Sequence, residues 1–151
     1  ELKDCKEVTG TGVDLSEKAL KIAQENRRNL GLEQTTALLQ SDLFEQVNGT
    51  YDMIVSNPPY IASEVITTLS EEVKDHEPMM ALDGGTDGLD FYRIIIERSP
   101  AYLASKGMLF FEIGYDQGAS VSQLMEKDFE NIHVIRDLAG LDRVVYGTYK
   151  A

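Results

Sequence analysis

The sequence predicts an α/β fold with a mostly parallel sheet, covered on both faces by helices and ending in an antiparallel pair of strands. Short apolar segments rich in β-branched residues alternate with segments whose apolar residues recur at helical spacing. The last two strand-like segments, residues 131–136 and 143–149, are joined by only a short turn, which favours antiparallel pairing. At 151 residues, the chain is expected to form one domain, 1–151.

The first half of the chain is expected to form a strand, a helix and two further strands. Residues 7–14 are predicted to be a strand that ends at an acidic residue. Ser16 is the predicted N-cap of the following helix, because its hydroxyl can accept a hydrogen bond from the first turn, and Gly31 is expected to end that helix. Strands are then expected over residues 35–40 and 51–56, the latter apolar enough to be buried on both faces.

The second half begins with an irregular segment. Residues 61–88 contain turn-rich sequence and are expected to form an insertion or lid rather than core. A helix over residues 89–103, a strand over 108–113 and a helix over 117–127 are predicted to follow. The two C-terminal strands complete the pattern.

The charge balance argues against some classes of partner. There are 14 Lys and Arg against 26 Asp and Glu, a net charge of -12, and no basic tract. Direct binding to a nucleic-acid backbone is therefore not expected. The single cysteine, Cys5, excludes an internal disulfide, so the cytoplasm is the expected compartment. No apolar run approaches the roughly 20 residues that cross a bilayer, so no membrane partner is expected.

No metal site is expected either. His76 and His133 lie far apart, with no cysteine at ligand spacing. Residues 83–88 look like the start of a calcium loop, but Gly85 and Ile94 occupy positions where oxygen ligands are needed. A hairpin turn bordering the functional site is the preferred interpretation.

The most informative feature is Asn57-Pro58-Pro59-Tyr60, directly after an apolar strand. Ligands of open α/β sheets bind beyond the carboxyl ends of strands. The two prolines lack N–H groups and fix φ, so the turn is stiff and presents acceptors. The Asn57 oxygen and a proline carbonyl can each accept a hydrogen bond from one planar NH₂ group, on which Tyr60 can stack. The pattern predicts methyl transfer to an amino or amide nitrogen. The alternative is a rigid turn in which Asn57 caps the strand and Tyr60 is core.

Two acidic residues upstream suit a nucleoside cofactor. Asp14 ends the strand predicted over residues 7–14, and in this kind of sheet a carboxylate at the end of the second strand typically holds the ribose hydroxyls of a nucleoside cofactor. Asp42, in the loop after the next strand, can accept from an adenine amino group, with Leu43 and Phe44 as apolar contacts. Each aspartate alone is more typical of a helix or turn cap, but together with Asn57 they favour the cofactor interpretation.

These motifs resemble the catalytic domain of HemK-type protein-(glutamine-N5) methyltransferases, and the resemblance covers nearly the whole chain. Asn-Pro-Pro-Tyr alone also occurs in DNA and RNA adenine methyltransferases, whereas the later segments are more specific to the HemK type. The main matching segments are Val13-Asp14-Leu15-Ser16, Ser41-Asp42-Leu43-Phe44, Ile54 to Ile61, Glu77-Pro78, Asp87 to Tyr92, Glu112-Ile113-Gly114, Asp137 to Gly140 and Asp142-Arg143-Val144.

The resemblance implies a Rossmann-like class I sheet that binds S-adenosyl-L-methionine. It implies methyl transfer from this cofactor to the side-chain amide nitrogen of the glutamine in the Gly-Gly-Gln loop of peptide chain release factors, the expected protein partners. The implied cofactor-binding residues are Asp14, Leu15, Asp42, Leu43 and Asn57. The implied catalytic and substrate-binding residues are Asn57, Pro58, Pro59 and Tyr60, with Glu77 as part of the substrate-side wall.

One departure concerns the start of the family's domain. Its first strand, its glycine-rich Asp-x-Gly-x-Gly-x-Gly turn and its N-terminal helical domain are missing from this sequence. Residues 9–12 superficially resemble the turn but are interpreted as strand, because no strand precedes them. A truncated catalytic domain is therefore expected, with two strands left as edges. A nucleic-acid adenine-N6 methyltransferase and a non-catalytic binding or assembly fragment are the alternatives.

Overall fold

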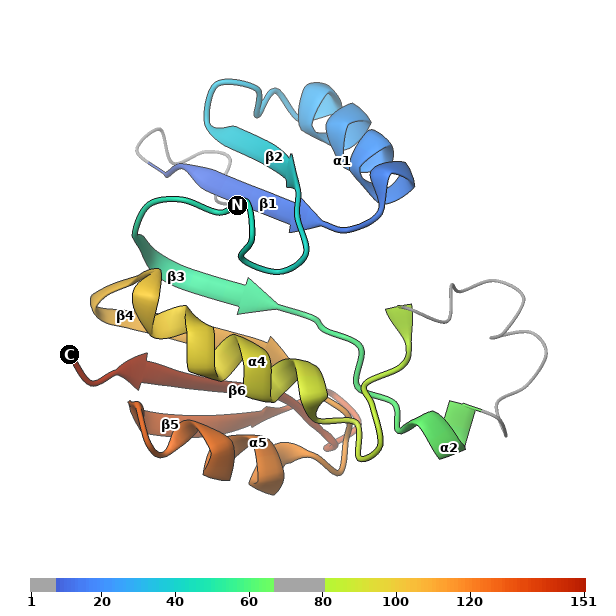
Figure 1. Ribbon diagram of the computed structural model, residues 1–151, viewed down its shortest axis with the longest axis vertical. Coiled ribbons are helices and arrows are strands. Elements are labelled where there is room, and N and C mark those ends of the chain that lie inside the picture. Colours follow the sequence, from blue (N-terminus) through green and yellow to red (C-terminus); the bar gives the residue numbers. More distant parts are fainter. Residues whose placement is uncertain (1–7, 67–80) are drawn as a thin grey trace. The chain divides into compact units, whose positions relative to one another are not determined.

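The computed structural model describes residues 8–66 and 81–151, and the chain divides into two compact units, Glu1–Gly49 and Thr50–Ala151 (Figure 1). Each unit has its own sheet, two-stranded in the N-terminal unit and four-stranded in the C-terminal unit. No helix in these described ranges is long and apolar enough to cross a bilayer.

The N-terminal unit is a strand, helix and strand: β1 (Gly10–Asp14), α1 (Glu17–Asn29) and β2 (Thr36–Gln40). The strands are parallel and in register from Gly10 opposite Thr36 to Asp14 opposite Gln40. Parallel neighbours need a crossover connection, which α1 supplies. The predicted order of elements is confirmed, and both strands end at the expected residues.

The ends of α1 follow its sequence signals. The Ser16 hydroxyl accepts a hydrogen bond from the Ala19 amide at 3.3 Å, which satisfies one of the first-turn donors. The last helical residue is Asn29, and Gly31 has a φ of 68°, in the left-handed region that glycine adopts without steric cost. Both predicted helix boundaries are confirmed.

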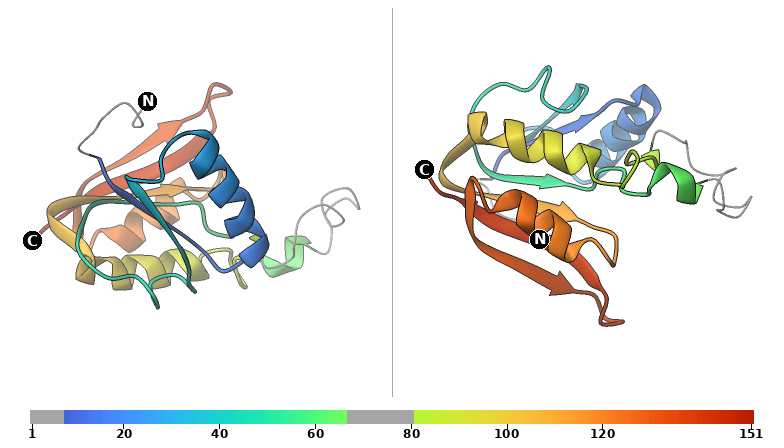
Figure 2. Two further views of the ribbon diagram at one scale, coloured as in Figure 1. Left: turned by 90° about the horizontal axis from the view of Figure 1, so that it is seen from above. Right: turned by 60° about the horizontal axis from the view of Figure 1, so that its bottom comes forward.

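The C-terminal unit has a mixed sheet with the order β3-β4-β6-β5. β3 and β4 are parallel, and β6 is antiparallel to both β4 and β5, so three strands run one way and one runs the other. The predicted antiparallel C-terminal pair is confirmed, and its turn projects beyond α5 in both views of Figure 2. The elements are β3 (Tyr51–Ser56), α2 (Ser63–Ile66), α4 (Asp90–Arg98), η3 (Ser99–Ala101), β4 (Leu103–Glu112), α5 (Gly118–Met125), β5 (Phe129–Arg136) and β6 (Asp142–Tyr149).

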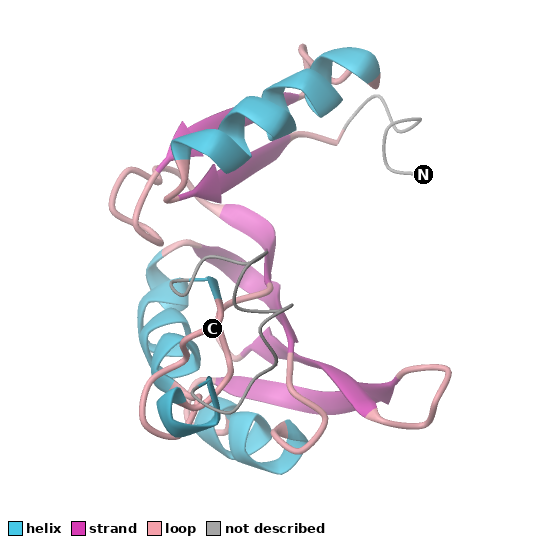
Figure 3. Cartoon of the chain, turned by 90° about the vertical axis from the view of Figure 1, so that its right-hand side faces the viewer, coloured by secondary structure: helices cyan, strands magenta, loops and turns pink. Residues whose placement is uncertain are grey.

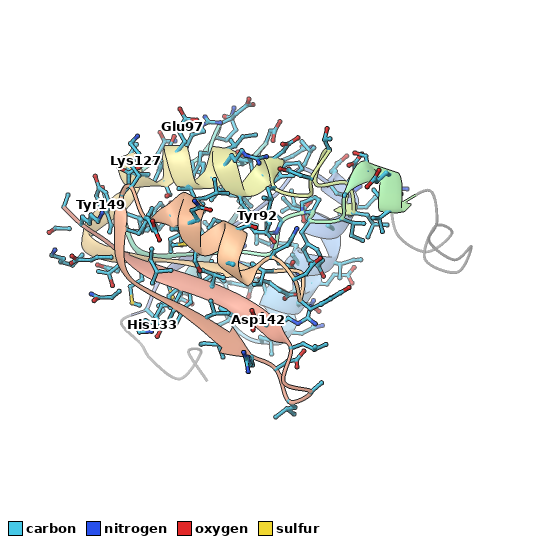
Figure 4. All side chains as sticks on the ribbon, turned by 90° about the horizontal axis from the view of Figure 1, so that it is seen from below. Tyr92, Glu97, Lys127, His133, Asp142 and Tyr149 are labelled. Carbon is cyan, nitrogen blue, oxygen red and sulfur yellow. The ribbon has the colours of Figure 1, made fainter. Side chains whose placement is uncertain are left out.

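The core of the C-terminal unit lies between its sheet and the helices α4 and α5, which cover the same face (Figures 1 and 3). Tyr92 is fully buried between the two helices, whereas Glu97 points away from α5 (Figure 4). The ring of Tyr92 meets that of Phe111 edge to face, with centroids 5.1 Å apart. The other buried apolar side chains include Ile95, Ile96, Leu109, Ile113, Val121, Met125, Phe129 and Val145.

β3 departs from its predicted burial. Met53 and Val55 share one face of the strand and are 52% and 71% exposed, so the prediction of burial on both faces is wrong. β3 ends the strand order of its sheet, and its only strand partner in the described residues is β4. An apolar run signals that a strand can be buried on both faces, but neighbouring elements decide whether it is.

The boundary between α4 and β4 also differs from the prediction. The helix ends at Arg98 instead of continuing to residue 103, and β4 begins at Leu103 rather than at Met108. Pro100 lies in the short 3-10 turn between them. Proline has no N–H to donate to the preceding turn, so the helix stops before it.

Candidate active site

The Asn-Pro-Pro-Tyr corner, residues 57–60, begins at the carboxyl end of β3. Ser56, the last residue of β3, pairs with Phe111 near the carboxyl end of the parallel strand β4. Asn57 is exposed, Pro58 is buried, and Pro59 and Tyr60 are half-buried. Within residues 8–66 and 81–151, the Asn57 side chain has no hydrogen-bond partner, so nothing there supports a strand-capping role. Its amide is available at the edge of the sheet where ligands bind.

The segment after the corner is held by residues 82–85. The Ile61 amide donates to the Leu82 carbonyl at 3.0 Å, and the Gly84 amide donates to the Ile61 carbonyl at 2.9 Å. The bridge between Ile61 and Asp83 is parallel. The prediction of a hairpin turn at residues 83–88 is wrong, because this segment leads into the helix α4 at Asp90 and not into a second strand.

Two glycines of this loop lie directly against the backbone of Tyr60. A Cβ atom at Gly84 would come within 2.8 Å of the Tyr60 Cα atom. Gly88 has a φ of 74°, and a Cβ atom there would overlap the Tyr60 carbonyl oxygen. Both glycines are buried, so this part of the predicted insertion packs as tightly as core. Their small size is what allows the loop to approach the corner.

Gln117, immediately before α5, connects the corner to two other segments. Its Nε2 atom donates to the carbonyl oxygens of Tyr60 at 3.0 Å and Gly88 at 3.2 Å. Its Oε1 atom accepts from the Gly114 amide at 3.0 Å and lies 3.4 Å from the Tyr92 hydroxyl. The sequence interpretation assigned Gln117 only to a helix. The sole sequence signal, a polar residue at a helix start, is too common to identify such a contact.

Tyr92 contacts the same region from within the core. Its hydroxyl donates to the Glu112 carbonyl at 3.0 Å, at the end of β4. Burial is the main cause that raises the pKa of Tyr92 above its ordinary value. Tyr92 therefore stays protonated and keeps its donor.

Carboxylates fasten the loop to its surroundings. Asp83 accepts from the Ser63 hydroxyl at 2.7 Å and from the Gly85 amide at 3.0 Å, and these hydrogen bonds lower the pKa of Asp83. The hydrogen bond from Arg93 lowers the pKa of Asp87 to about 2. Asp83 thus ties the loop to Ser63 of α2, and Asp87 ties it to Arg93 of α4. No group of three or more metal-binding side chains occurs in the part of the chain that the structure describes.

The predicted cofactor residues lie in the N-terminal unit. Asp14 ends β1, and its Oδ1 atom accepts from the Ser16 amide at 2.7 Å, which is the turn-capping contact considered as the alternative. Its Oδ2 atom has no partner among the described residues, and the side chain is exposed. Leu15, 48% exposed, lies beside it. Capping and ligand binding can coexist, because they use different oxygens.

Asp42 and Leu43 lie at the same edge of the two-stranded sheet as Asp14. The Ser41 amide donates to the Asp14 carbonyl at 3.1 Å, which joins the turn after β2 to the end of β1. The Ser41 hydroxyl donates to the Leu43 carbonyl at 2.9 Å, and Leu43 has a φ of 47°. Asp42 is exposed and Leu43 is half-buried, whereas Phe44 is only 8% exposed and offers little surface to a ligand.

These features fit a nucleoside. Exposed carboxylates can accept from ribose hydroxyls and from an adenine amino group, and Leu15 and Leu43 offer apolar contact. The structure thus brings Asp14, Leu15, Asp42 and Leu43 together in one unit, and residues 57–60 form a continuous corner in the other. Glu77, predicted on the substrate side, lies outside the described residues, as does His76.

The fold defines the class of protein. The model of the methyltransferase small domain family matches residues 2–76. A crystal structure of a methyltransferase from Pyrococcus furiosus superposes with a TM-score of 0.66 at 16% identity, over 95% of this chain and 63% of that one. The chain has the α/β methyltransferase fold that the sequence predicts.

The relatives with much higher identity carry one name, release factor glutamine methyltransferase. The release factor glutamine methyltransferase of Agrobacterium fabrum is 41% identical over 145 residues, covering 95% of this chain and 50% of the relative. That of Caulobacter vibrioides is 44% identical over 140 residues, covering 91% of this chain and 48% of the relative. The chain is similar to release factor glutamine methyltransferases over 91–95% of its own length, and it spans about half the length of the relatives it matches.

Proposed function

We propose that the protein containing this chain transfers a methyl group from S-adenosyl-L-methionine to the side-chain amide nitrogen of a glutamine in peptide chain release factors. The observation that carries the proposal is the Asn-Pro-Pro-Tyr corner, with its exposed Asn57 at the carboxyl end of β3. The names of the relatives supply the substrate class. The two units would belong to one catalytic domain, because the match to the relatives covers 95% of this chain and so extends over both.

The corner suits a substrate whose nucleophile is weak. An amide nitrogen delocalises its lone pair into the carbonyl, so orientation must supply much of the rate. The Asn57 Oδ1 atom and the Pro58 carbonyl would accept one hydrogen bond each from the NH₂ group. Both acceptors would stabilise positive charge that develops on nitrogen, and Tyr60 would pack on the flat carboxamide and exclude water.

The bound cofactor supplies the electrophilic methyl group. Asp14 would hold its ribose hydroxyls through the Oδ2 atom, and Asp42 would accept from its adenine amino group. Leu15 and Leu43 would contact the ring, and Asn57 would also face the cofactor. After transfer, the nitrogen carries one proton too many, which can pass to water, so no strong general base is required.

The test is methyl incorporation by the full-length protein from labelled S-adenosyl-L-methionine. We expect label in a release factor with an intact Gly-Gly-Gln loop and none in a matched factor whose loop glutamine is changed to alanine. Label that persists after this change, or no label in either factor, would contradict the proposal.

A nucleic-acid adenine methyltransferase would use the same corner, because an adenine also presents a planar NH₂ group. The net charge of -12 in this chain counts against a phosphate backbone as partner. Single-stranded and duplex DNA and RNA, assayed beside the release factor, distinguish the two. The cytoplasm is the proposed compartment, in keeping with a single cysteine.

A further inference from the structure

We propose that Gln117 is a positioning residue for amide methylation: its side-chain amide fixes the Tyr60 carbonyl, and through it the acceptors of Asn57 and Pro58. The inference rests on the proposed function, since it assigns to Gln117 the task of holding the corner that would bind the substrate amide. Gln117 itself would touch neither substrate nor cofactor.

The donor and acceptor groups of the Gln117 side-chain amide match those of its partners. The Tyr60 and Gly88 carbonyls only accept hydrogen bonds, and they lie 3.0 and 3.2 Å from Nε2. The Gly114 amide only donates, and it lies 3.0 Å from Oε1. The side chain therefore has one possible orientation, with its NH₂ group toward the corner.

The backbone of Gln117 is itself fixed. Its amide donates to the Gly114 carbonyl at 3.0 Å, and its carbonyl accepts from the Val121 amide at 2.9 Å in the first turn of α5. The Gly114 residue that anchors Oε1 directly follows Ile113, which is fully buried. Gln117 thus connects a rigid part of the core to the corner, which lies 57 residues earlier in the chain.

The backbone between the Tyr60 carbonyl and the proposed acceptors of Asn57 and Pro58 is short and stiff. Pro58 and Pro59 lie between Asn57 and Tyr60, and each proline fixes one of its two soft backbone dihedrals. Fewer soft dihedrals therefore separate the Tyr60 carbonyl from Pro58 and Asn57 than in a chain without proline, so a shift of this carbonyl is passed on in part. Gly84 and Gly88 also lie directly against the Tyr60 backbone, which limits how far it can move.

The fold retains other contacts when the Gln117 donors are lost. The hydrogen bonds of Ile61 with Leu82 and Gly84 do not involve Gln117, so the segment after the corner stays attached. We therefore expect loss of the Gln117 donors to lower kcat more strongly than it lowers the stability of the fold. A displacement of the acceptors by about 1 Å can lower the rate on the order of 100-fold.

The test is Gln117→Glu in the full-length protein, with kcat and KM measured on the release factor between pH 6 and 9. Glutamate keeps the acceptor for Gly114 but turns a charged oxygen toward two carbonyl oxygens. We expect kcat to fall about 10- to 100-fold at pH 8, with KM and cofactor affinity within a few fold. The Tyr60 and Gly88 carbonyls should raise the pKa of the new carboxyl. At pH 6 a protonated carboxyl can again donate a hydrogen bond to one of them, so the kcat of the variant should recover relative to that of wild type.

Gln123→Glu is the matched control, because it makes the same charge change at an exposed position of α5. We expect its kcat to equal that of wild type at every pH. If Gln117→Glu does not fold, Gln117→Met provides a neutral side chain of similar length without hydrogen bonds, and its kcat should fall without recovery at low pH.

The outcomes separate the two proposals. An active wild type with a folded Gln117 variant that keeps wild-type kcat would refute the role of Gln117 and leave the proposed function intact. A loss confined to KM would also refute it. A wild-type protein that methylates no release factor would refute the proposed function itself.

Discussion

Replacing Asn57 by alanine in the full-length protein should abolish most turnover and leave stability almost unchanged. Asn57 is exposed and its side chain has no hydrogen-bond partner in residues 8–66 and 81–151. Its removal therefore leaves no buried group unsatisfied, and the free energy of unfolding should change by less than about 0.5 kcal/mol. The expected effect on kcat is much larger, because loss of one oriented hydrogen-bond partner of a reacting group lowers kcat about 100- to 1,000-fold.

The assay compares kcat on the release factor, cofactor affinity by calorimetry, and the midpoint of urea unfolding. We expect a fall in kcat of at least about 100-fold, with cofactor affinity within a few fold of wild type. Asn29→Ala, an exposed asparagine at the last position of α1, is the control and should change none of the three. Wild-type turnover by Asn57→Ala would refute the assignment, and a large drop in stability would show that Asn57 is a structural cap.

Three further predictions follow from the structure. Asp14→Asn should keep the turn contact of Oδ1 but lower cofactor affinity measurably by calorimetry; equal affinity would mean that the carboxylate serves only the turn. Gly88 and Gly140 both have positive φ, but only Gly88 lies against the corner. Gly88→Ala should therefore destabilise the protein more than Gly140→Ala in urea unfolding, and it should also lower kcat. Equal effects of the two substitutions would refute a tight contact at Gly88. Because Arg93 lowers the pKa of Asp87 to about 2, the stability from this pair is present above pH 4 and lost as pH falls toward 2. Arg93→Gln should flatten that part of a plot of thermal midpoint against pH, and an unchanged slope would exclude the pair as its source.

The alternatives to methylation of a release factor make different demands on the same residues. A nucleic-acid methyltransferase would need Asn57 and Tyr60 for a base, and it would lose affinity steeply as salt rises. A non-catalytic assembly fragment would need neither residue. Calorimetric titration of the 151-residue chain with S-adenosyl-L-methionine addresses the fragment directly, since a folded sample that gives no heat would favour it.

Local signals in the sequence determined most of the elements and the place of the corner. A hydroxyl at Ser16 and a glycine at Gly31 act within one helical turn, so the limits of α1 were predictable. The apolar run 51–56 and the prolines after it placed Asn57 at the end of a strand, because these preferences also act between neighbours in the chain.

Only the tertiary structure decided which distant residues meet. The exposure of Val55 depends on what packs against β3, and the link from Gln117 to Tyr60 spans 57 residues. The parallel pairing of Ile61 with Asp83 likewise follows from how two irregular segments pack. Hydrogen bonds between such segments depend on positions in space, which residue spacing along the chain does not encode, so a single sequence reveals the chemistry available at the corner but not the contacts that hold it in place.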